Sequence, residues 1–80
     1  MRQLLDVVRV EVRPNHTLIL DFENGERRLF DMTPYLDRKP WLGLKDLPLF
    51  ARAAVEHGTV VWPGEIDIAP ETLYDRSQPA

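Results

Sequence analysis

Cysteine and long apolar runs are both absent from this chain of 80 residues. The lack of cysteine excludes disulfides, thiol nucleophiles and cysteine-ligated metals. A transmembrane helix needs about 18 consecutive apolar residues, so none is expected. The first residues also lack the apolar segment and cleavage site of a signal peptide. We therefore expect a protein of the cytoplasm, in a bacterium or similar cell, without membrane contact.

Positive charge is in short supply as well, because 10 Lys and Arg are set against 13 Asp and Glu, for a formal net charge of −3. Proteins that bind nucleic acid contact its phosphates through a basic surface. The chain is therefore not expected to bind nucleic acid directly. Its two basic pairs, Arg27-Arg28 and Arg38-Lys39, are interpreted as solvated surface.

Motifs for catalysis or metal binding are missing from the sequence. There is no Gly-rich phosphate loop, and the only serine is Ser77, near the end of the chain. His16 and His57 lie in predicted turns, and their spacing matches no metal motif. We expect no enzyme activity, no metal and no cofactor.

The length indicates one domain over residues 1–80, with an ordered core at about 5–76 and a frayed tail at 77–80. A core of this size contributes only about 3–5 kcal/mol of stability. Docking on a partner protein, or formation of a homodimer, is a natural supplement.

Alternating side chains predict three strands, over residues 7–13, 17–22 and 26–31. Asn24-Gly25 is a strong hairpin signal between the last two, because both residues tolerate positive φ. The pattern favours an antiparallel meander. Its expected inward-facing residues are Val8, Val10, Val12, Leu18, Leu20, Phe22, Arg28, Phe30 and Met32.

The first helix is expected to begin with Thr33 as its N-cap and Pro34 in its first turn. Asp31 is a further candidate for a contribution to that cap. A one-turn helix is predicted within residues 44–50, since Pro48 prevents a longer one.

The remaining chain favours a hairpin and a terminal helix. Residues 51–56 and 59–62 are predicted strands around a turn at 57–58, and residues 69–74 are a predicted helical turn. The expected fold is α+β. It combines a small antiparallel sheet, made of the three-stranded meander and a second hairpin, with short helices.

Several of these segments occur together in one known family. They are Val8 to Val12, Pro14, Leu18 to Phe22, Asn24-Gly25, Phe30-Asp31-Met32-Thr33-Pro34, Leu44-Lys45-Asp46 with Phe50, and Gly58 to Tyr74. Over about residues 5–76 the chain therefore resembles the small bacterial family numbered 2442 among the domains of unknown function. Its most specific part runs from Trp62-Pro63 to Tyr74. Gly64 directly after Pro63 departs from the family pattern.

This resemblance implies an α+β fold with a small antiparallel sheet, and no established activity. Some relatives carry a helix-turn-helix segment after this domain. Others lie beside a small companion protein in an arrangement similar to toxin–antitoxin pairs. In the second arrangement, the resemblance implies that this chain is the member of the pair that binds the other protein.

Two carboxylates allow both a functional and a structural interpretation. Asp67 lies between two isoleucines and is a candidate site residue. The preferred interpretation is that it caps the following helix or holds the Pro63-Gly64 turn. Asp31 precedes the first predicted helix and is interpreted as a cap in the same way.

Large aromatic side chains are plentiful for this length. Trp41, Tyr74 and Tyr35 are candidate interface residues, while Trp62, inside a strand, is assigned to the core. The leading hypothesis is a non-catalytic protein-interaction module that binds a partner protein or itself. The alternatives are a regulatory accessory, either antitoxin-like or a partner of a helix-turn-helix protein, and a small ligand-binding domain or enzyme using Asp67 and Asp31.

Overall fold

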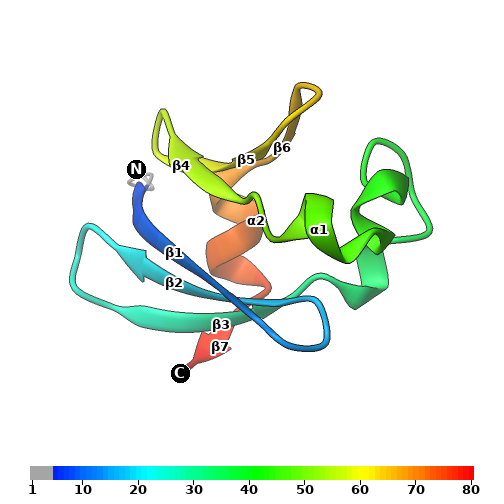
Figure 1. Cartoon of the computed structure of the whole chain (residues 1–80). Coiled ribbons are helices and arrows are strands. Elements are labelled where there is room, and N and C mark those ends of the chain that lie inside the picture. The colour runs from blue at the N-terminus through cyan, green and yellow to red at the C-terminus, as the bar shows by residue number, and fades with distance from the viewer. Residues whose placement is uncertain (1–4) are drawn as a thin grey trace.

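Two antiparallel sheets and four short helices form a small α+β fold in a computed structural model, which describes residues 5–80. In chain order the elements are β1 (Val7–Arg13), β2 (Thr17–Phe22), β3 (Arg27–Asp31), η1 (Thr33–Tyr35), η2 (Leu42–Lys45), α1 (Leu47–Phe50), β4 (Ala54–Glu56), β5 (Thr59–Trp62), β6 (Ile66–Ile68), α2 (Pro70–Asp75) and β7 (Gln78–Pro79). Figure 1 shows the sheet of β4, β5 and β6 above the sheet of β1, β2, β3 and β7, with α2 running behind from one to the other. The expected α+β class is confirmed.

The predicted meander is present, but a β-bulge changes which valines of β1 are buried. Val7 pairs with Phe22 and Arg9 with Asp21, so β1 has one more residue than β2 at this point. Val7 is consequently buried, and Val8 is 57% exposed instead of facing inward. The alternation resumes after the bulge, where Val10 is half-buried.

The turn between β2 and β3 lies where the sequence predicts it, but only one of its two signal residues adopts a positive φ. The backbone N–H of Phe22 bonds to the carbonyl of Glu26, which leaves three residues in the loop. Gly25 has a φ of 88°, whereas Asn24 is not among the residues with positive φ. The Asn24 side chain accepts a hydrogen bond from the Glu26 N–H instead.

The segment predicted to fray takes part in the first sheet. Gln78 pairs with Leu29 and Pro79 with Arg28, so β7 becomes the fourth strand beside β3. Ser77, just before it, is buried. Residues 77–80 are therefore attached to the sheet, and the expectation of a free tail is corrected.

The second sheet contains one strand more than the predicted hairpin. His57 and Gly58, with φ values of 52° and 78°, form the tight turn between β4 and β5 as expected. The strand before it begins only at Ala54, because residues 51–53 continue the turn of α1. Residues 66–68 then add β6 to the other side of β5.

The helix caps differ in part from the predictions. Thr33 is the first residue of η1 and not its N-cap, a position that Met32 occupies. The Asp31 carboxylate accepts a hydrogen bond from the Thr33 N–H. Asp31 therefore makes the contact at the start of this helix for which the sequence made it a candidate. Asp46 caps α1 by accepting from the Leu49 N–H.

One apolar core joins the two sheets and the helices. Its most deeply buried side chains come from both sheets, the N-cap of η1, η2 and α2, and include Leu18, Leu20, Phe30, Met32, Leu44, Val60 and Leu73. The expected inward positions of β2 and β3 are thus correct. None of the helices within residues 5–80 has the length and apolar character needed to cross a membrane.

Candidate functional site

The outer face of the second sheet is the candidate site. Side chains alternate along its strands, so Val60, Trp62 and Ile68 point into the core. The intervening residues form a row across the sheet, in which Val61 pairs with Ala54 on one side and Asp67 on the other. Ala54 and Asp67 are exposed, and Val61 is half-buried between them.

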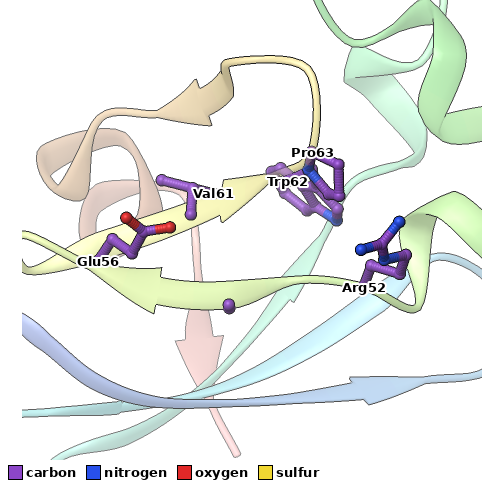
Figure 2. A pocket seen from close by; sticks show the side chains of 6 residues that line it. Arg52, Glu56, Val61, Trp62 and Pro63 are labelled. Carbon is purple, nitrogen blue, oxygen red and sulfur yellow. The ribbon is translucent and has the colours of Figure 1, made fainter.

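This face is hollowed in two adjoining places, with volumes of about 260 and 340 Å³. Both hollows are lined by Glu56, Val61, Trp62 and Pro63. Figure 2 shows the first hollow, with Arg52 and Glu56 toward opposite ends and Val61 and Pro63 coming from the β5 side. We call the surface formed by Arg52, Ala54, Glu56, Val61, Pro63, Glu65 and Asp67 the β4–β6 face.

Negative charge dominates the β4–β6 face. It carries the carboxylates of Glu56, Glu65 and Asp67, and its only cationic member is Arg52. All four side chains belong to exposed residues. No ion pair within residues 5–80 involves any of them. These charges are therefore available to a binding partner.

Asp67 belongs to this face through its side chain and to a strand edge through its backbone. Its carbonyl oxygen accepts a hydrogen bond from Nε1 of Trp41. The N-cap of α2 is Ala69, with no side-chain hydrogen bond at the cap. The interpretation of Asp67 as a cap of this helix is therefore corrected. Pro63 and Gly64 lie in the turn between β5 and β6, where Gly64 and Glu65 have positive φ.

Asp31 is not part of the β4–β6 face. It ends β3 in the other sheet, and its carboxylate bonds to the Thr33 N–H at 2.9 Å. Asp31 and Asp67 therefore lie on different sheets, and no hydrogen bond or ion pair within residues 5–80 connects them. Within residues 5–80, no three His, Asp or Glu side chains are grouped as they would be around a metal ion.

The three candidate interface aromatics are each half-buried and fixed by neighbours. Tyr35 stacks on Phe30 with ring centroids 5.5 Å apart, and Trp41 meets Tyr35 edge-on at 5.7 Å. Trp62 is buried, as assigned from the sequence, and its Nε1 donates to the Phe50 carbonyl. The three candidate interface residues, Trp41, Tyr74 and Tyr35, do not line the β4–β6 face.

Tyr74 belongs to a polar cluster that holds the end of the chain. Its hydroxyl donates to Glu26 at 2.5 Å, and the Arg28 guanidinium lies 4.6 Å from its ring centroid. Arg28 also donates to Oγ and the carbonyl oxygen of Ser77. The hydrogen bond from Tyr74, followed by those from Asn24 and Arg28, lowers the pKa of Glu26. The same bond raises the pKa of Tyr74, with burial adding to it.

The histidines have structural contacts beyond their predicted turns. His16 lies in the turn between β1 and β2, where its Nε2 is 2.9 Å from the Leu44 carbonyl and its ring is 4.8 Å from that of Phe50. These contacts attach the first sheet to η2 and α1. His57 remains an exposed turn residue.

Sequence reasoning placed Glu65 on one face with Asp67, but it missed Arg52 and Glu56 as members of the same surface. Glu56 and Asp67 are 11 positions apart and line the same hollow because β4 and β6 both pair with β5. The signal that was present is the period-two alternation, which places Glu56 and Val61 outward. The missing information was that residues 66–68 pair with β5.

A family model described as "Protein of unknown function (DUF2442)" matches residues 7–79. The matched segment runs from β1 to β7 and includes the whole β4–β6 face. No curated protein matches the chain, and no solved structure does. The site must therefore be interpreted from its own chemistry.

Proposed function

The chain belongs to the DUF2442 family of unknown function, and from that premise we propose that it is a non-catalytic, cytoplasmic protein-interaction module. Its binding surface in this proposal is the β4–β6 face, and its partner presents a basic segment. The observation that carries the proposal is the combination of Glu56, Glu65 and Asp67 around the apolar Val61 on a hollowed sheet face.

Charge supports a basic partner. The three carboxylates have no ion-pair partner within residues 5–80, and the net charge of the chain is also negative. Complementary charge steers association and disfavours partners of the same sign. Lys or Arg side chains of the partner would contact Glu56 and Asp67, while an apolar side chain would cover Val61 and Pro63.

Shape supports a segment of protein as the ligand. Small-molecule sites enclose most of the surface of their ligand. Here two open hollows adjoin along the surface of a sheet and share Val61 and Pro63. An extended segment can place successive side chains in both hollows.

Self-association through this face is disfavoured by the same charges. Two copies meeting face to face would bring Glu56, Glu65 and Asp67 against carboxylates of the same kind. We therefore propose a different protein as the partner. A regulatory accessory of a helix-turn-helix protein is one form of this proposal, since its partner is also a protein.

The test begins with light scattering after size-exclusion chromatography, to establish the oligomeric state. A photo-crosslinking residue is then placed at Val61 in the cell that encodes the chain, and at Leu29 on the outer side of the other sheet as a control. The expected result is a partner crosslinked from position 61 and not from position 29. Equal crosslinking from both positions contradicts the proposal.

The purified partner is then titrated against the wild type and charge-reversed variants. Glu56→Lys and Asp67→Lys should each weaken binding by about tenfold or more, because like charges would meet across the interface. Glu23→Lys, an exposed turn residue outside the face, should change binding by less than about twofold. Unchanged affinity in the first two variants, or a dimer that these variants dissociate, would overturn the choice of partner.

A further inference from the structure

A second cleft, separate from the β4–β6 face, has the opposite charge. It has a volume of about 350 Å³ and is lined by Pro34, Tyr35, Arg38, Thr72 and Arg76. The first three come from η1 and the turn after it, and the last two from α2 and its C-cap. Two arginines therefore line one cleft in a chain of net charge −3.

Both guanidinium groups are without a carboxylate partner in the part of the chain that the structure describes. The acidic neighbour of Arg38 in the sequence, Asp37, pairs with Lys45 at 2.8 Å. Two cations lining the same cleft repel each other, and a bound anion would offset that repulsion. The cleft therefore carries two positive charges that no carboxylate of residues 5–80 neutralises, and an anion can bind there.

The backbone holds the two arginines in place. The Arg38 N–H bonds to the Tyr35 carbonyl, and the Arg76 N–H bonds to the Thr72 carbonyl. Thr72 and Arg76 are four residues apart, so their side chains lie on the same side of α2. Tyr35 is fixed between Phe30 and Trp41 and gives the cleft a rigid wall.

We propose that this cleft binds a small phosphate group, either free or as the ester of a small molecule. Each guanidinium can donate two parallel hydrogen bonds to phosphate oxygens, and the two positive charges balance a dianion. The Thr72 hydroxyl is a further donor at the same surface. A cleft of about 350 Å³ is at the small end of the range for ligand sites, which suits such a group.

This site is independent of the proposed function, because it shares no lining residue with the β4–β6 face. From the sequence, Arg38 was interpreted as solvated surface. No motif or spacing in the sequence predicts that Arg38 lies near Arg76. The two are brought together by the packing of α2 beside η1.

The test is an amide NMR titration of the full chain with inorganic phosphate and with glycerol phosphate, at constant ionic strength. The expected result is saturable shifts at Tyr35, Arg38, Thr72 and Arg76 in the millimolar range or below. Tighter binding of the ester than of free phosphate identifies an ester as the ligand, and the reverse identifies the free ion. Acetate should bind more weakly than either.

Matched variants separate a site from general charge attraction. Arg38→Gln and Arg76→Gln should each weaken phosphate binding by about tenfold. Arg9→Gln makes the same charge change in β1, outside the cleft, and should leave binding unchanged. The proposal is wrong if no saturable shift occurs, or if Arg9→Gln weakens binding as much as Arg38→Gln. Circular dichroism confirms that each variant is folded, and Arg38→Lys, which keeps the charge and loses the fork, should show an intermediate affinity.

Discussion

Nε1 of Trp41 donates a hydrogen bond to the carbonyl oxygen of Asp67 at 2.9 Å, across 26 positions of the sequence. β6 is an edge strand, with β5 on its other side. The indole thus occupies a backbone acceptor on a strand that could otherwise pair with another chain. Trp41 is a candidate for binding a partner, and the structure places its indole nitrogen against a strand edge of its own molecule.

Trp41→Phe should lower the free energy of unfolding by about 1 kcal/mol or more, because one hydrogen bond is lost and the smaller phenyl ring buries less surface. The freed carbonyl should also increase self-association. Chemical denaturation and light scattering measure the two effects.

Trp62→Phe is the matched control, since Nε1 of Trp62 bonds to the Phe50 carbonyl in the core. It should destabilise the fold without increasing self-association, because β6 keeps its protection. Equal self-association of the two variants would show that the Trp41 bond does not protect the edge.

The three aspartates near turns and helices should differ in their contributions to stability. Asp31→Ala and Asp46→Ala remove carboxylates that accept backbone N–H bonds, from Thr33 and Leu49 respectively. Each should cost about 1 kcal/mol of unfolding free energy. Asp67→Ala should stay within about 0.5 kcal/mol, because its exposed carboxylate caps no helix.

Urea denaturation of the four proteins measures this order. A large loss of stability in Asp67→Ala would restore a structural role for that carboxylate. A stable Asp67→Ala variant that loses its partner would assign the carboxylate to binding.

Tyr74→Phe should change the dependence of stability on pH. The hydrogen bond from Tyr74 is the largest cause that lowers the pKa of Glu26 below its ordinary 4.5. A lowered folded-state pKa stabilises the protein above 4.5, and this contribution is lost as the pH falls through the lower value. The pKa of Tyr74 is raised above 10.0, so its contribution is complete below 10.0 and is lost as the pH rises through the higher value.

The difference in unfolding free energy between wild type and Tyr74→Phe should therefore be largest between pH 4.5 and 10.0 and should shrink on both sides. Chemical denaturation over a pH series measures it. Tyr35→Phe is the control, because its hydroxyl makes no hydrogen bond within residues 5–80. A constant difference for Tyr74→Phe across this series would exclude the linkage to Glu26.

Local patterns predicted much of the sheet structure. Period-two alternation placed Leu18, Leu20 and Phe30 in the core, where they are fully buried. The turn at His57-Gly58 was also predicted correctly, because the conformation of such a turn depends on the residues within it. These features depend on neighbours that are close in the sequence.

Other features required the tertiary structure. The bulge that exposes Val8 arises from the pairing of two strands, since the alternation of β1 alone gives no sign of an extra residue. The pairing of Gln78 with Leu29 joins segments 49 positions apart, and the polar residues around it showed no strand pattern. Thr33 and Asp31 were both considered for one helix cap, and only the backbone geometry assigned that contact to Asp31.

The sequence by itself determined the family, because its motifs from Val8 to Tyr74 occur together in that family. It also determined the fold class and the inward faces of the central strands, because burial of apolar side chains imposes a period that can be read along the chain. Only the tertiary structure decided which surface residues meet. Glu56 and Asp67 line one hollow on either side of β5, and Arg38 and Arg76 line the cleft between η1 and α2. Exposed charged residues carry no periodic signal of their own, so their neighbours are set by how distant elements pack together.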